Sequence, residues 1–244
     1  MHEPSPHTGL LVSVEGINGV GKDYLLERFR PQLAAPSHTI AEFSARMRTD
    51  GTPGLSEQIL KAMHQASHGD HFLRGGTPRS ETLLLFAVKT HDYEHSRPRL
   101  DAGDIVLEGR SLHSTAVYQA LILQQDRPLE TARRLLALGA QWRPLPDLTI
   151  FVTDDVDTAL ERAQQRDHKQ FTAEERLLHH QADELFRALA ASSDRSRILD
   201  RRTAPPDDAA ARIAEWINEA PRAAHIADVP EQRTVSPASG EVSP

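Results

Sequence analysis

The chain has 244 residues, no cysteine and a formal net charge of −7, and 39% of its residues are hydrophobic. This length suits one large α/β domain or two small ones, and the missing cysteines exclude disulfides, thiolate metal sites and cysteine nucleophiles. The negative charge argues against a sequence-independent nucleic-acid binder, because affinity for the phosphate backbone comes from clustered Lys and Arg.

In chain order, short apolar runs alternate with amphipathic segments between two tails. Residues 1–8 predict a loose N-terminal tail, and residues 221–244, rich in Pro, Ala and Ser, predict a tail that is disordered or draped over the surface. Residues 9–220 are therefore expected to form the folded domain. The predicted strands are 10–14, 39–43, 105–107, 148–152 and 197–199. The first run is too short for a membrane span or a signal-peptide core, so we expect no membrane partner. The lack of cysteine fits a reducing, cytoplasmic location, which we expect for this protein.

Helical periodicity separates these strands. Three segments place apolar side chains on one helical face: Val156, Ala159, Leu160 and Ala163; Leu178, Ala182, Leu185 and Leu189; and Ala210, Ile213, Ala214 and Ile217. Alternation of strand and helix predicts an α/β fold, a five-stranded parallel sheet with helices on both faces. In such sheets ligands bind beyond the carboxyl ends of the strands, so we look for the chemistry there.

The first predicted strand runs into a glycine-rich turn that is followed by a helical pattern. The turn matches G-x-x-x-x-G-K, whose backbone N–H groups surround phosphate oxygens and whose lysine reaches the β- and γ-phosphates. It predicts a P-loop three-layer fold that binds a nucleoside triphosphate. The expected cradle residues are Gly16, Asn18, Gly19, Val20, Gly21, Lys22 and Asp23.

Asp23 stands where Ser or Thr is usual. A hydroxyl at that position normally reaches Mg²⁺, and a carboxylate is also a good Mg²⁺ ligand. We therefore predict a metal role for Asp23. The alternative is an acidic side chain stabilised by the positive end of the helix dipole.

This turn and three later blocks resemble the thymidylate kinase family, with features of the deoxynucleoside kinases. The resemblance runs from about residue 10 to residue 218. Its later blocks are Leu84-Leu85-Phe86-Ala87, Glu108-Gly109-Arg110 with Ser114-Thr115-Ala116-Val117-Tyr118-Gln119, and Pro146-Asp147 with the strand that follows. It implies an enzyme that transfers the ATP γ-phosphoryl group, with Mg²⁺, to a nucleoside monophosphate such as dTMP, and it implies a homodimer.

On the acceptor side, the resemblance implies that Phe86 stacks on the base and that Arg110 grips the acceptor phosphate. A planar guanidinium that donates two parallel hydrogen bonds suits that task. Tyr118 and Gln119 match positions near the base.

On the donor side, the resemblance places Arg162 and Arg166 as lid arginines that neutralise charge on the transferring group. The lid itself is expected at about residues 166–172. The P-loop carries no arginine, which fits the branch of the family that keeps its arginines in the lid.

The sequence departs from the family at several site positions. Asn18 stands in place of an aspartate, and Thr90 replaces the arginine that contacts the thymine carbonyl. Gly109 takes the position of the family's aspartate before Arg110. If the chain bulges there, Glu108 substitutes for that aspartate, so Glu108 joins Asp23 as a candidate metal ligand.

Glu42 leaves the choice of acceptor open. It opens the run Glu42-Phe43-Ser44-Ala45-Arg46, which is closer to the Glu-Pro-x-x-Arg pattern of deoxynucleoside kinases, in which the glutamate is the base for a sugar hydroxyl. One alternative is therefore a diverged kinase for the hydroxyl of a nucleoside or another small molecule. A second alternative is a non-catalytic nucleotide-binding regulatory module. The candidate catalytic residues are Lys22, Glu42, Arg110 and Arg166.

Overall fold

The computed structural model describes residues 7–40, 54–68, 70, 72–168 and 170–221. Its centre is a five-stranded sheet in the order β2-β3-β1-β4-β5, in which every neighbouring pair is parallel. The strands are β1 (Leu10–Glu15), β2 (Ser37–Ile40), β3 (Ile105–Gly109), β4 (Leu148–Thr153) and β5 (Ser196–Asp200). The predicted parallel α/β fold is confirmed.

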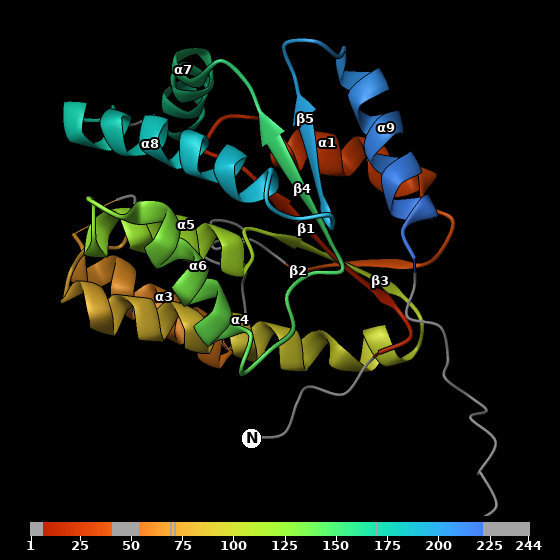
Figure 1. Ribbon diagram of the computed structural model, residues 1–244, viewed down its shortest axis with the longest axis horizontal. Helices are drawn as coiled ribbons and strands as arrows, with labels where there is room; N and C mark the ends of the chain where they lie inside the picture. The colour runs from red at the N-terminus through yellow and green to blue at the C-terminus, as the bar shows by residue number, and fades with distance from the viewer. Residues whose placement is uncertain (1–6, 41–53, 69, 71, 169, 222–244) are drawn as a thin grey trace, which may run out of the picture.

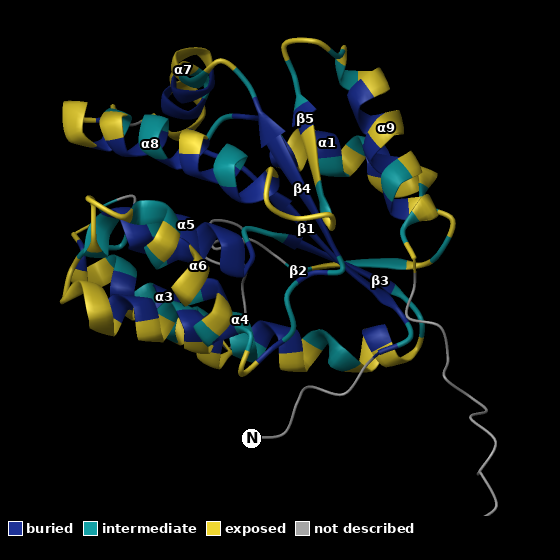
Figure 2. Ribbon diagram, viewed as in Figure 1, coloured by how far each residue is buried: buried dark blue, intermediate teal, exposed yellow. Residues whose placement is uncertain are grey.

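Helices follow each strand in turn. They are α1 (Lys22–Phe29), the short 3-10 helix η1 (Arg30–Gln32), α3 (Leu55–Ala66), α4 (Pro78–Asp101), α5 (Leu112–Leu123), α6 (Pro128–Gly139), α7 (Val156–Asp167), α8 (Ala173–Ala190) and α9 (Pro206–Glu219). The three predicted apolar faces lie on α7, α8 and α9. Apart from the half-buried Val156, every residue of these faces is buried. Figure 2 shows that the inner strands β1, β3 and β4 are buried and that the helices have one buried and one exposed side.

The helices form a layer on each face of the sheet, because alternate strand side chains point to opposite faces. On one face Leu11 packs with Tyr93 and Leu100 of α4, and Phe151 lies 5.8 Å from the ring of Phe186 on α8. Helices α1 and α9 lie side by side on the other face (Figure 1). The carboxyl ends of all five strands meet at one edge between these layers.

The predicted tails have different outcomes. The last two residues of the predicted loose N-terminal tail are packed, which corrects that boundary. His7 is buried, and the Thr8 hydroxyl donates to the backbone oxygen of Asp101 at 2.9 Å. Most of the predicted C-terminal tail, residues 222–244, lies outside the described residues. In the part of the chain that the structure describes, none of the helices is both long and apolar enough to cross a membrane.

Candidate active site

The glycine-rich turn connects β1 to α1 at the carboxyl edge of the sheet. Its glycines Gly16, Gly19 and Gly21 have φ values of 137°, 80° and 87°, in the region that L side chains rarely adopt. A Cβ atom on Gly19 would lie 1.7 Å from the backbone oxygen of Ala159 on α7. Glycine is therefore required both by the backbone conformation and by the close approach of α7. The local structure is that of a P-loop.

Lys22 lies inside this loop. Its Nζ donates to the backbone oxygens of Gly16 at 3.3 Å and Ile17 at 3.2 Å, and the residue is only 8% exposed. Phosphate oxygens are stronger acceptors for an ammonium group than neutral carbonyls are. The ammonium is thus placed to exchange these carbonyls for phosphate. Asp23, the next residue, is exposed in the first turn of α1.

Arg110 reaches the P-loop from the neighbouring strand. It follows β3 directly with a φ of 60°, and its Nη2 donates to Oδ1 of Asn18. Its Cζ also lies 5.9 Å from the centre of the Tyr118 ring. Arg110 therefore lies at the carboxyl edge of the sheet, beside the P-loop.

Glu15 positions the turn that carries Arg110, and the sequence analysis missed it. Its fully buried carboxylate accepts hydrogen bonds from the backbone N–H of Ser111 at 2.7 Å and the hydroxyl of Ser111 at 2.6 Å. The hydroxyl of Ser114 on α5 donates to its second oxygen. Desolvating a carboxylate is costly unless several donors surround it, so these bonds fix Arg110 relative to the start of the P-loop. The available signal was an acid at the end of an apolar strand.

Helix α7 brings the predicted lid arginines over the P-loop. Arg162 and Arg166 follow Ala159 by three and seven residues, so all three lie on the side of the helix that approaches Gly19. Arg162 is paired with Asp154, at the carboxyl end of β4.

Arg166 lies near both halves of the site. A hydrogen bond to Asp167 at 2.7 Å raises the pKa of Arg166 above its ordinary value. The negative charge of Asp23 raises this pKa further, and the positive charge of Arg110 lowers it. Arg166 is therefore within electrostatic range of Asp23 at the start of α1 and of Arg110.

The predicted base-side residues come from α4 and α5. The carbonyl oxygen of the buried Gln119 accepts a hydrogen bond from the Thr82 hydroxyl at 2.8 Å. Tyr118 Oη lies 3.3 Å from Nδ1 of His179, and burial raises the pKa of Tyr118 above its usual value, an effect that the nearby Arg110 opposes. Gln119 therefore connects α5 to α4, whereas Tyr118 connects α5 to α8.

Phe86 and Thr90 lie one helical turn apart on α4. The Phe86 ring is 2% exposed and packs 6.1 Å from the ring of Trp142. Thr90 is half-buried. The roles in base recognition predicted for these two residues stay predictions.

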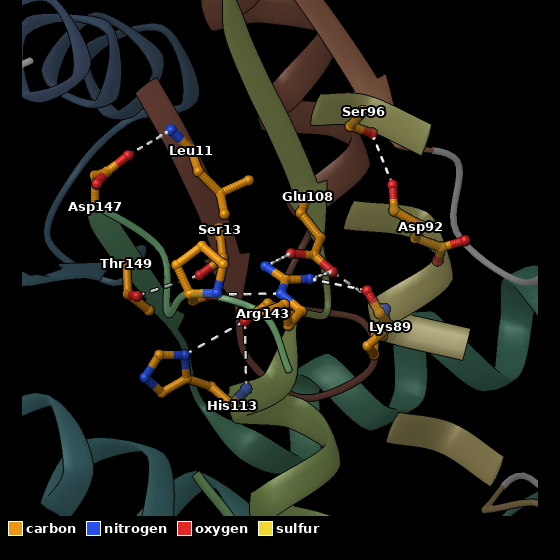
Figure 3. Close-up of polar contacts among 12 residues, drawn as sticks. Leu11, Ser13, Lys89, Asp92, Ser96, Glu108, His113, Arg143, Asp147 and Thr149 are labelled. Carbon is orange, nitrogen blue, oxygen red and sulfur yellow. Dashed lines mark hydrogen bonds and ion pairs between the residues drawn. The ribbon is translucent and has the colours of Figure 1, made fainter. Parts of the chain in front are cut away.

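The structure contradicts the metal role predicted for Glu108. That role needs a bulge in β3, but β3 pairs with β1 in unbroken register from Ile105 to Gly109. The Glu108 carboxylate is fully buried, and it accepts hydrogen bonds from Arg143 Nη1 at 3.0 Å and Nη2 at 2.9 Å (Figure 3). Lys89 Nζ lies 3.7 Å from the same carboxylate. Both oxygens are thus engaged by cations of the protein itself.

Two predictions remain, the catalytic role of Glu42 and the binding of magnesium by Asp23. Glu42 lies outside the described residues. Among residues that are described, no group of three or more His, Cys, Asp or Glu is placed to hold a metal ion. Asp23 fits a magnesium ion that takes most of its ligands from phosphates and water, because Mg²⁺ commonly uses one or two carboxylates together with substrate phosphates.

His113 gives a testable pH dependence of stability. Burial lowers the pKa of this α5 histidine, and the positive charge of Arg143 lowers it further, against the opposing charges of Glu15 and Glu108. Below the ordinary histidine pKa of about 6.5 the unfolded chain therefore binds a proton that the folded chain resists. We expect the contribution of His113 to be fully present above the unfolded pKa of ~6.5, to decline as the pH falls below it, and to be lost once the pH has fallen through the lowered pKa of the folded protein.

The measurement is the free energy of unfolding in urea at pH 5.5, 6.5 and 7.5. His113→Asn is expected to flatten this dependence. An unchanged slope in His113→Asn would contradict the interpretation.

Comparison with known proteins identifies the family of this site. The thymidylate kinase family model matches residues 14–213, a range that contains the P-loop, Arg110 and both lid arginines. The chain belongs to the thymidylate kinase family. The match covers most of the folded domain.

Individual thymidylate kinases support this assignment. The chain is 32% identical over 221 residues to the thymidylate kinase of Leifsonia xyli subsp. xyli, which covers 87% of this chain and 96% of that protein. It is also 32% identical over 205 residues to that of Bifidobacterium longum, with 79% and 89% covered. The solved thymidylate kinase of Candida albicans superposes with a TM-score of 0.61 at 19% identity, over 87% of this chain and 92% of that one. At this identity the structural match supports the fold alone.

Proposed function

We propose that this chain is an ATP-dependent thymidylate kinase, which transfers the γ-phosphoryl group of ATP to the phosphate of dTMP. Its family membership supports the reaction class. The observation that carries the proposal is the position of Arg110, which meets Asn18 of the P-loop. A guanidinium beside the phosphate cradle suits an acceptor that itself carries a phosphate.

The reaction needs no general base. A phosphate monoester is largely ionised at neutral pH, so an oxygen of the dTMP phosphate attacks the γ-phosphorus directly. The bond from the γ-phosphorus to the β–γ bridging oxygen breaks, and ADP leaves with that oxygen. Catalysis then rests on positioning and on charge neutralisation.

Four side chains among the described residues supply the positive charge that neutralises the phosphates. Lys22 turns from its backbone acceptors to the β- and γ-phosphates, and Arg110 holds the acceptor phosphate. Arg162 and Arg166 exchange their carboxylate partners for oxygens of the transferring group. Mg²⁺ supplies further charge neutralisation on the phosphates when it is bound, with Asp23 as its carboxylate ligand. Closure of the segment 166–172 excludes water and limits hydrolysis of ATP.

The decisive experiment is turnover of ATP with Mg²⁺, measured as ADP release, with nucleoside monophosphates, nucleosides or water alone as acceptors. We expect strong stimulation by dTMP and almost none by thymidine. Lys22→Met is the negative control and is expected to abolish the signal. Stimulation by nucleosides alone would overturn the proposal in favour of a hydroxyl kinase that uses Glu42. ATP binding without stimulation by any acceptor would favour the non-catalytic module.

Asp23 provides a separate prediction about magnesium. If its carboxylate binds the metal, Asp23→Ala is expected to raise the Mg²⁺ concentration at half-maximal rate by about tenfold, the equivalent of one moderate ligand contact. Asp23→Ser, which restores the hydroxyl usual in this motif, is expected to raise it less. The measurement is the initial rate against free Mg²⁺ at saturating ATP. Identical Mg²⁺ curves for the wild type and both variants would contradict the ligand role.

Two further properties belong to the proposal. We propose a homodimer, by analogy with the family, and a cytoplasmic location, which the lack of cysteine favours. Sedimentation of the purified chain tests the first of these directly.

A further inference from the structure

Arg201 lies against the P-loop, and no sequence motif indicates this position. It follows β5 directly, and its backbone N–H donates to Thr153 O of β4 at 3.0 Å. This bond fixes the residue at the carboxyl edge of the sheet. From there its Nη1 donates to Val20 O at 3.0 Å. A Cβ on Gly21 would lie 2.4 Å from the same nitrogen, so the guanidinium rests directly on the loop backbone.

The guanidinium of Arg201 has hydrogen-bonding capacity left over. Its Nε is buried and has no hydrogen-bond partner among the described residues. The Tyr24 ring, 5.8 Å from Cζ, covers it without accepting a hydrogen bond in the plane of the guanidinium. A guanidinium carries five N–H donors and recognises planar or tetrahedral oxyanions with several of them at once.

The sheet order separates Arg201 from Arg110. The P-loop follows the central strand β1, Arg110 follows β3 on one side of it, and Arg201 follows β5 on the other side. Accordingly Arg110 contacts the early loop residue Asn18, whereas Arg201 contacts the late loop residue Val20. If the acceptor and the transferring phosphate lie toward Arg110, the rest of the donor nucleotide extends toward Arg201.

The charges of the loop also favour an anion at Arg201. Lys22 is the only cationic side chain within residues 16–23, and Asp23 adds a negative charge beside a cradle that must hold a triphosphate. Arg202, the neighbour of Arg201, differs from it in exposure and in hydrogen-bond partners. It is exposed, and its guanidinium is paired with Asp200.

Resting on the proposed kinase function, we propose that Arg201 binds the donor nucleotide through the phosphate nearest the nucleoside. Its guanidinium contacts that phosphate where the chain passes from Gly21 into α1, and its charge compensates for Asp23. Arg201 is thus a second arginine of the phosphate site, on the donor side, complementary to Arg110 on the acceptor side.

The test compares Arg201→Gln with the matched control Arg202→Gln, using calorimetric binding of ADP and of inorganic tripolyphosphate without magnesium or acceptor. We expect Arg201→Gln to weaken both ligands about tenfold, which corresponds to the loss of one charge-assisted contact, and Arg202→Gln to weaken neither. In steady-state turnover the KM for ATP is expected to rise similarly, with the KM for dTMP changed less than about twofold.

Unchanged binding of both ligands in Arg201→Gln would overturn the proposal. Weaker binding of ADP with unchanged binding of tripolyphosphate would also overturn it, because the contact would then be to the base or ribose. If Arg201→Gln melts far below the wild type, a second pair of variants replaces it. Arg201→Lys keeps the positive charge, and the proposal requires it to bind tripolyphosphate better than a folded Arg201→Ala does. These binding readouts need no acceptor, so they remain decisive even if dTMP is not the substrate.

Discussion

Replacing Arg110 with alanine is expected to lower kcat/KM for dTMP by about three orders of magnitude, while the affinity for ATP changes little. A bidentate arginine that holds a phosphate also aligns it for in-line attack and balances charge in the transition state. Loss of such a group in phosphoryl transfer costs roughly 10³–10⁵ in rate. Because Lys22 and the P-loop backbone remain, the donor site is retained.

The backbone conformation at Arg110 allows alanine to replace arginine without a change in the turn. Arg110 already has a φ of 60°, so alanine inherits the same backbone conformation and adds no new strain. The turn itself is held by Glu15 through Ser111, which the substitution leaves intact. A loss of activity would therefore report on the guanidinium and not on the fold.

Steady-state kinetics with dTMP varied at saturating ATP, together with ADP binding by calorimetry, measure the effect. Arg110→Lys keeps the positive charge but lacks the two parallel N–H donors of a guanidinium. Its kcat/KM for dTMP is expected to lie between those of the wild type and Arg110→Ala. Arg134→Ala removes an exposed arginine on α6, paired with Glu130, and is expected to change nothing. Unaltered kcat/KM in Arg110→Ala would remove the main support for a phosphate acceptor.

The sequence was sufficient for the fold because its signals are local. The three inner strands β1, β3 and β4 are short, largely apolar runs, as buried parallel strands must be, and the amphipathic faces of α7, α8 and α9 follow the helical period. The P-loop is equally local, because its glycines and Lys22 are consecutive in the chain. Arg110 was found because a residue that directly follows a buried strand lies at the ligand edge of the sheet.

The errors and omissions concern residues whose partners are distant in the chain. Glu108 is adjacent to Gly109 in sequence, but the unbroken register of β3 turns its side chain toward α4 and Arg143. Nothing in the sequence around Arg143 indicates that it would be fully buried. Arg201 is 181 residues from its partner Val20, so only the assembled sheet brings the two together.

Substitution of Arg143 by methionine is expected to destabilise the protein by roughly 3–5 kcal/mol, the usual cost of removing one partner from a buried ion pair. Arg143 and Glu108 are both fully buried, and Arg143 also donates to the backbone oxygen of Lys89 at 3.3 Å (Figure 3). Without the guanidinium, the Glu108 carboxylate keeps only the ammonium of Lys89, 3.7 Å away. That distance is too long for a hydrogen bond, so the carboxylate is left largely uncompensated.

Urea unfolding of Arg143→Met, Glu108→Leu and the double variant separates the cost of a broken pair from the value of the intact one. The double variant is expected to be more stable than either single variant, because an apolar pair of similar volume leaves no buried charge unpaired. Lys89 reduces the expected stability of the double variant, because its ammonium no longer has the Glu108 carboxylate as an ion-pair partner. A coupling energy near zero, or a stability of Arg143→Met within about 1 kcal/mol of the wild type, would mean that water or Lys89 already solvates Glu108. A large coupling energy would instead show that Arg143 and Glu108 act as one buried unit, at the end of β3 immediately before Arg110.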